Sequence, residues 1–210
     1  MTHDREKKYR QYLFYLHAQI VEGTDGNPRS PRHGVYEYFE IIETFSNLGF
    51  HVISEIRPIN CNVNAYARKL TGEIESLLAS GVPAENITVV GASKGGMIAA
   101  TVSHLLENPQ IRYVILAGLF PALHEKGGVR LHGEVLSIHD KADKFPIRPE
   151  LFFNDSPGLT RSKTVITETG LGHGILYRPY PIWTEEVLSW IGFHRNAQDD
   201  IQPELSGNRY

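Results

Sequence analysis

Short apolar runs alternate with longer segments of helical periodicity along most of this chain. Six runs of four or five residues are rich in β-branched and aromatic side chains, a pattern that predicts strands. They lie at 12–16, 51–54, 87–90, 113–116, 135–138 and 163–166. Because helical segments separate most of these runs, we predict an α/β fold: a three-layer α/β/α sandwich around a mostly parallel sheet of about six strands.

The helical segments contain apolar residues that recur three or four positions apart. Between residues 62 and 80, for example, Tyr66, Leu70 and Ile74 recur on one face, and Gly81 follows as a stop signal. Helices are predicted at 35–48, 62–80, 97–106 and 182–193. The segment 22–34 is rich in Gly, Pro and Ser, and it predicts a long loop that is functional or mobile.

The length of the chain fits one domain. A chain of 210 residues buries a sizeable core without disulfides or metals. We predict a single domain over residues 1–196 and a flexible tail at 197–210, where apolar residues are few. The single cysteine, Cys61, excludes an intramolecular disulfide and fits a reducing compartment.

Charge and hydropathy narrow the range of partners. The net charge is −3 and the Lys and Arg residues are scattered, so there is no electrostatic case for nucleic acid. The first residues lack the apolar core of a signal peptide, and no apolar run approaches the ~20 residues that cross a bilayer. We predict a cytoplasmic protein that acts on a small molecule, with no membrane partner. A homodimer is left open.

The sequence GASKG at residues 91–95 matches the motif G-x-S-x-G. It lies between the predicted strand 87–90 and the predicted helix 97–106, where this motif places a serine nucleophile on a sharp turn above the sheet edge. Glycines two positions before and after Ser93 allow the strand and the helix to approach each other. The backbone N–H of Lys94 then opens the helix and is placed to receive a developing oxyanion.

Other glycine-rich sites fit this segment poorly. A phosphate-binding P-loop requires G-x-x-x-x-G-K-[ST], whereas Lys94 lies between Ser93 and Gly95. A dinucleotide fingerprint requires glycine at the position of Ser93 and an acidic residue about 20 positions later. Metal motifs such as H-E-x-x-H and C-x-x-C are absent from the sequence. We predict neither a cofactor nor a bound metal.

Candidate partners for Ser93 follow later strands in the order acid, then histidine, that this chemistry uses. Asp143 lies in the loop after the fifth predicted strand, and His173 lies between two glycines after the sixth. We prefer Asp143 over Asp140, which is closer to the end of the strand, and Asp140 stays the alternative. In such a triad His173 acts as general base toward Ser93, and the aspartate orients the imidazole.

These segments resemble the α/β-hydrolase superfamily, and the resemblance extends from about residue 12 to residue 193. TVVGASKGG is similar to the nucleophile elbow of that family, LSIHDKAD to its acid loop and LGHG to its histidine loop. The resemblance implies the α/β-hydrolase fold and a triad of Ser93, Asp143 and His173.

The first predicted strand also resembles this family, with one departure. The segment YLHA ends at Ala18, where the family usually has glycine. On this match the backbone N–H of Gln19 is the second oxyanion donor, beside that of Lys94. The connection between residues 118 and 133 is too short for a lid domain, which implies an open, shallow site.

Several side chains near these segments are candidates for contact with a substrate. The candidates for lining the pocket are His17, Tyr177 and Trp183. The side chain of Lys94 either favours an anionic substrate or points away, so that the residue contributes only its N–H. Arg57 either binds a substrate carboxylate or pairs with Glu55 or another acid nearby.

The predicted function is that of a serine hydrolase. Ser93 attacks a carboxylic ester or thioester, an acyl-enzyme forms, and water releases the acid. One alternative is an acyltransferase on the same triad, since only the acceptor differs. The other is a non-catalytic binding module on a hydrolase scaffold.

Overall fold

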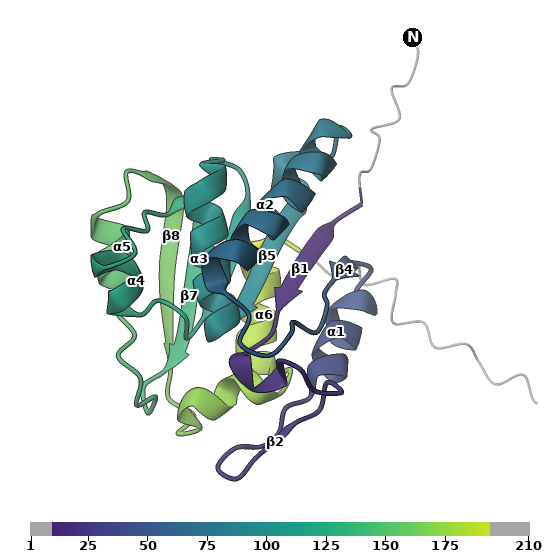
Figure 1. The fold of residues 1–210 in the computed structure, drawn as a ribbon, viewed down its shortest axis with the longest axis vertical. Coiled ribbons are helices and arrows are strands. Elements are labelled where there is room, and N and C mark those ends of the chain that lie inside the picture. Colours follow the sequence, from purple (N-terminus) through teal and green to yellow (C-terminus); the bar gives the residue numbers. More distant parts are fainter. Residues whose placement is uncertain (1–9, 194–210) are drawn as a thin grey trace, which may run out of the picture.

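The computed structural model describes residues 10–193 of the chain. Its centre is a six-stranded sheet with every neighbouring pair parallel, in the order β4-β1-β5-β6-β7-β8 (Figure 1). The strands are β1 (Tyr12–Leu16), β4 (His51–Ile53), β5 (Ile87–Ala92), β6 (Arg112–Leu116), β7 (His132–Asp140) and β8 (Gly158–Thr167). The predicted α/β sandwich is confirmed. The tail predicted at 197–210 lies outside the described residues.

Helices cover both faces of the sheet, because successive strand side chains point to opposite faces. Leu13 and Tyr15 pack on the side of α1 and α6, whereas Phe14 and Leu16 pack on the side of α2 and α3. The helices are α1 (Tyr38–Ser46), α2 (Val63–Ala79), α3 (Lys94–Leu106), α6 (Pro181–Trp190) and the short α4 (Pro121–Glu125) and α5 (Pro149–Asn154). Within residues 10–193, no helix has both the length and the apolar character needed to span a membrane.

Two regions differ from the sequence-based expectation. A small antiparallel ribbon, β2 (Arg29–Ser30) with β3 (Gly34–Val35), spans the end of the predicted loop 22–34 and the first residue of the predicted helix, so α1 begins at Tyr38 rather than at residue 35. The helix predicted from residue 97 begins at Lys94, directly after Ser93. Two-residue strands and single helical turns have no periodicity to detect, which explains both differences. The same holds for the 3₁₀ helices η1 (Gln19–Val21), η2 (Ala84–Asn86) and η3 (Gly172–Tyr177).

The strand order places a topological switch point between β1 and β5. The chain adds β4 on one side of β1 and then crosses to add β5 on the other side. Leu16 at the end of β1 pairs with Gly91 of β5, so the loops that follow these two strands leave the sheet side by side. In parallel sheets of this kind, ligand sites lie at the carboxyl edge beside such a switch point.

The start of α3 packs closely against the end of β1. A Cβ atom at Gly95 would collide with the carbonyl oxygen of Leu16 and would lie 2.7 Å from that of His17. At Gly91, a Cβ atom would collide with the carbonyl oxygen of Gly95. Glycine is therefore required at both positions by close backbone approach.

We expect Gly95→Ala to lower the free energy of unfolding by about 2 kcal/mol or more, because the added methyl group forces the backbone to shift. Gly72 in α2 is a matched control, since nothing lies within 4 Å of a Cβ atom built there. Gly72→Ala is expected to raise the free energy of unfolding by about 0.5–1 kcal/mol. Urea unfolding of both variants measures the contrast, and a neutral Gly95→Ala would contradict the close approach.

Candidate active site

Ser93 occupies the sharp turn between β5 and α3, with φ 53° and ψ −114°. A positive φ is uncommon and costly for a residue with a side chain. Two backbone hydrogen bonds hold this turn: Ser93 N–H donates to Leu116 O (2.8 Å), and Met97 N–H donates to Ser93 O (3.0 Å). The structure thus forms the strained strand-to-helix turn that the G-x-S-x-G motif predicts.

Ser93, His173 and Asp143 lie in one hydrogen-bonded line. The Ser93 Oγ is 2.9 Å from His173 Nε2, and His173 Nδ1 is 2.7 Å from Asp143 Oδ2. The side chain of Asp143 is 2% exposed and that of His173 is 14% exposed. Because the carboxylate accepts the hydrogen bond from Nδ1–H, Nε2 is left to accept the hydroxyl proton of Ser93. The three residues come from the loops after β5, β7 and β8, at the carboxyl edge of the sheet.

Asp140, the alternative acid, has a different position. It lies at the end of β7, and its Oδ2 accepts hydrogen bonds from Thr167 Oγ1 (2.9 Å), Thr169 Oγ1 (2.7 Å) and Thr169 N–H (2.8 Å). Its Oδ1 accepts from Ala142 N–H (2.9 Å) and Gly172 N–H (3.1 Å). Asp140 therefore ties the end of β7 to the loop that carries His173, and it does not contact the imidazole.

These hydrogen bonds determine the ionisation of Asp140. Burial alone raises the pKa of this carboxyl, but the hydrogen bonds from Thr169, Ala142 and Thr167 outweigh it. The pKa of Asp140 therefore lies well below its ordinary value, because the bonds are made to the charged form.

The two predicted oxyanion donors lie on adjacent segments. Gln19 is the first residue of η1 and Lys94 is the first residue of α3. First-turn N–H groups have no carbonyl partner within their own helix, so both are open to an acceptor. Ala18, in place of the family's glycine, has φ −70° and ψ 163°, an extended conformation that alanine adopts without strain. The departure at Ala18 thus leaves the turn intact.

The three residues predicted to line a pocket are buried in the core. His17 is 0%, Trp183 1% and Tyr177 7% exposed. His17 Nδ1 donates to Ala18 O at 2.8 Å, and Trp183 Nε1 donates to Arg178 O at 2.8 Å. In this conformation these side chains offer a substrate little surface.

Three residues near the triad were not predicted from the sequence. Phe145 is 54% exposed, and its ring centroid lies 4.6 Å from that of His173. The ring of His33, in the turn between β2 and β3, packs against the histidine loop, where a Cβ atom at Gly174 would lie 2.7 Å from its Nδ1. Burial, Arg32 and His173 lower the pKa of His33.

The third such residue is Glu22, which ends the turn after β1. Its carboxylate lies 2.8 Å from Lys94 Nζ and 3.6 Å from Arg57 Nε. Neither basic side chain is therefore directed to solvent: Lys94 pairs with Glu22, and Arg57 pairs with this same acid rather than with Glu55. Charged residues that follow different parallel strands meet at the carboxyl edge of the sheet. The position of Glu22 after the first predicted strand was the sequence signal by which this residue could have been found.

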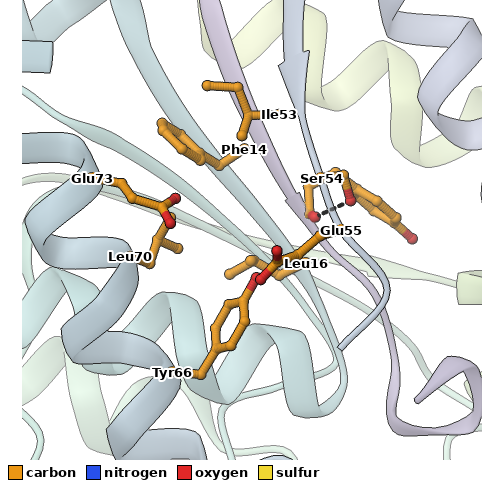
Figure 2. Close-up of a pocket in the computed structure, with 9 residues that line it drawn as sticks. Phe14, Leu16, Ile53, Ser54, Glu55, Tyr66, Leu70 and Glu73 are labelled. Carbon is orange, nitrogen blue, oxygen red and sulfur yellow. Dashed lines mark hydrogen bonds between the residues drawn. The ribbon is translucent and has the colours of Figure 1, made fainter. Parts of the chain in front are cut away.

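Two cavities lie against α2, on the face of the sheet that this helix covers. The smaller, of about 180 Å³, lies between β1, β4 and α2, where Tyr66 points its hydroxyl toward Glu55 (Figure 2). The larger, of about 530 Å³, shares Glu55 and Tyr66 and is otherwise lined mainly by residues 58–62. Neither cavity is lined by Ser93 or His173. Within residues 10–193, no three His, Cys, Asp or Glu side chains are grouped to hold a metal ion.

Comparisons with known proteins identify the fold. No family model matches the sequence, and no curated protein matches it. Among solved structures, a lipase-esterase related protein from Clostridium acetobutylicum is similar with a TM-score of 0.58 and 15% identity, over 85% of this chain and 93% of its own. SOBER1 from Arabidopsis thaliana is similar with a TM-score of 0.58 and 14% identity, over 88% and 98%.

A third similar structure is the Francisella virulence factor BioJ, with a TM-score of 0.60 and 10% identity, over 90% of this chain and 79% of its own. Together with the parallel sheet and its helical layers, these similarities show that the chain has the α/β-hydrolase fold. The resemblance seen in the sequence is confirmed at the level of the fold. At such identities the chemistry has to be argued from the site itself.

The hydrogen bonds of Asp140 lead to a prediction about stability and pH. We expect Asp140→Asn to lower the free energy of unfolding at pH 7 by about 2 kcal/mol, since an amide nitrogen would face several donors. Because the folded pKa lies below the unfolded value of about 3.9, the stabilisation by the carboxylate is complete above pH 5 and is lost as the pH falls through the folded pKa.

The difference in the free energy of unfolding between the wild type and Asp140→Asn should therefore shrink as the pH falls below about 4. Urea unfolding at several pH values measures it. Asp25→Asn is the control, because Asp25 is exposed and accepts one long hydrogen bond, from Asn27 N–H at 3.4 Å. A difference that stays constant down to pH 2.5 would contradict this account.

Proposed function

We propose that this protein is a serine hydrolase that cleaves a carboxylic ester or thioester of a small molecule. The observation that carries the proposal is the line of hydrogen bonds from Asp143 through His173 to Ser93, with Ser93 on a strained turn. Strained backbone clusters at functional sites, and a serine that combines a positive φ with contact to a histidine–aspartate pair is typical of a nucleophile. The α/β-hydrolase fold supports the proposal, since it holds its nucleophile on a turn of this kind.

The geometry supports acyl transfer in two steps. Ser93 Oγ attacks the carbonyl carbon while His173 Nε2 takes the hydroxyl proton, and Asp143 stabilises the imidazolium. The carbonyl oxygen becomes an oxyanion, which the N–H groups of Gln19 and Lys94 receive. Collapse breaks the bond to the alcohol or thiol, which leaves with the proton from His173. Water then repeats the sequence on the acyl-enzyme and releases the acid and free Ser93.

The side chains around the triad indicate the polarity and charge of the substrate. The ring of Phe145 packs at a tilt against that of His173 and is half exposed, so an apolar group of the substrate has a surface to contact there. The ammonium of Lys94 is held by Glu22, and a substrate therefore gains no charge pairing from it. These features favour an uncharged ester or thioester.

A fluorophosphonate tests the nucleophile directly. We expect one adduct per chain in the intact mass of the wild-type protein, because an activated Ser93 attacks phosphorus as it attacks a carbonyl. Ser93→Ala should show no adduct while it unfolds at a similar urea concentration. A folded wild type without an adduct would contradict the proposal and favour a non-catalytic binding module.

The aspartate has its own test. Asp143→Asn should lower kcat on p-nitrophenyl acetate by about 10³- to 10⁴-fold, because the imidazole loses the partner that fixes its tautomer. Asp140→Asn, measured at a temperature where it is folded, should lower kcat far less, since Asp140 does not contact His173. The reverse ranking would assign the role of the acid to Asp140.

A further inference from the structure

The buried side chains behind the oxyanion donors form a charged network that the proposed mechanism does not use. Glu22 ends the turn that begins with Gln19, and its N–H donates to Gln19 O at 3.0 Å. Its side chain is 2% exposed, that of Arg57 is 0% exposed and that of Lys94 is 14% exposed. One carboxylate thus lies between two cations, one from the start of α3 and one from the loop after β4.

We propose that Glu22, Lys94 and Arg57 form a clamp of positioning residues that sets the distance between the two oxyanion donors. The inference rests on the proposed function, because it concerns the same site. Gln19 and Lys94 belong to segments far apart in the sequence, so only tertiary contacts can place their N–H groups at a common point.

The first half of the clamp joins two turns: the nucleophile turn, which carries Ser93 and Lys94, and the oxyanion turn, which runs from residue 17 to residue 23. Lys94 Nζ lies 2.8 Å from Glu22 Oε1 and 2.9 Å from Glu22 Oε2. Lys94 also supplies one donor through its N–H, and Glu22 closes the turn that supplies the other. The ion pair therefore links the two donor segments directly, with no other residue between them.

The second half of the clamp holds both ends of the oxyanion turn. Arg57 N–H donates to His17 Nε2 at 3.0 Å, and its guanidinium donates to His17 O, at the start of the turn. Arg57 O accepts from Gly23 N–H at 2.9 Å, at the end of the turn. Arg57 thus brackets the segment from residue 17 to residue 23, while its Nε faces Glu22 at 3.6 Å.

His17 acts within the clamp as a neutral link. Burial, followed by the charge of Arg57, lowers the pKa of His17 to about 4. Since Nε2 accepts the hydrogen bond from Arg57 N–H, the proton lies on Nδ1, which donates to Ala18 O at 2.8 Å. Both ring nitrogens of this histidine are therefore engaged, one by Arg57 and one by Ala18, and neither is free for proton transfer.

The charge balance distinguishes the roles of Glu22 and Lys94. Without the Lys94 ammonium, Glu22 still faces Arg57, and each buried charge keeps a partner. Without the Glu22 carboxylate, two cations lie beside each other with no anion. Loss of Glu22 should cost stability as well as activity, whereas loss of the Lys94 ammonium should act mainly on activity.

The test uses the full-length protein and p-nitrophenyl acetate, a small uncharged ester. Lys94→Met keeps the backbone N–H at position 94 but removes the ion pair, so we expect kcat to fall by about 10- to 100-fold with KM within about twofold. Lys94→Arg should retain most of the activity, since it keeps the charge and the reach. Combining Lys94→Met with Glu22→Gln should lower kcat little further than Glu22→Gln alone, because the residues act as a unit.

The matched control is Lys69→Met. Lys69 also pairs with a glutamate, Glu55, but both side chains of this pair are about half exposed. Its removal should leave kcat unchanged. Hydrogen exchange of the amides between residues 18 and 23 gives a readout besides activity, and it should speed up in Lys94→Met and Glu22→Gln but not in Lys69→Met.

The outcomes separate the clamp from the proposed function. If the wild type is active and Lys94→Met matches it in kcat and in exchange, the clamp is overturned and the hydrolase stands. If Lys69→Met loses as much activity as Lys94→Met, the effect is a general loss of charge and the clamp is again overturned. A folded wild type that neither turns over ester nor reacts with a fluorophosphonate overturns the proposed function, and the clamp's catalytic purpose with it.

Discussion

The parallel pairing of β1 with β5 is the constraint on which the rest of the site depends. It aligns Leu16 with Gly91, so that the turn of residues 17–23 and the turn at Ser93 leave the sheet next to each other. The close approach of Gly95 to the carbonyl groups of Leu16 and His17 fixes how near they lie. The strained backbone of Ser93 persists because strands buried on both faces over-determine its position.

At the carboxyl edge of the sheet, paired buried charges hold the loops in place, whereas apolar packing holds the elements together elsewhere in the molecule. The loops after β1 and β4 contribute Glu22 and Arg57, and the end of β7 with its following loop contributes Asp140 and Asp143; the four side chains are almost inaccessible to solvent. An unpaired charge at such a position is costly, so each requires a partner of fixed geometry. Since the partners of Glu22 and Asp143 come from distant loops, satisfying the charges also fixes the loops relative to one another.

The fold and the chemistry rest on separate arguments. The α/β-hydrolase fold follows from the sheet order and from solved structures that share only 10–15% of their residues with this chain. A fold of this kind supports many activities, and it does not by itself identify a nucleophile or a substrate. The assignment of Ser93, His173 and Asp143 as a catalytic unit rests on the distances between their side chains and on the strain at Ser93.

The sequence by itself determined the elements that carry periodicity or a spaced motif. Six strands and four long helices were predicted because core burial imposes a period on apolar residues, and the order of Ser93, Asp143 and His173 was predicted because the strand–loop order brings them to one edge. The preference for Asp143 over Asp140 rested on a difference of three positions, and the structure alone shows which of the two contacts the imidazole.

Only the tertiary structure decided the buried side-chain partners. No local pattern marks Glu22, because its carboxylate is paired by Lys94 and Arg57, which lie 72 and 35 positions further along the chain. Packing between distant segments likewise decided the burial of His17, Tyr177 and Trp183. It also decided the β2–β3 ribbon, which lies in a segment predicted mainly as a loop. Periodicity reports which face of an element is buried, whereas the identity of each contact depends on how the elements meet in space.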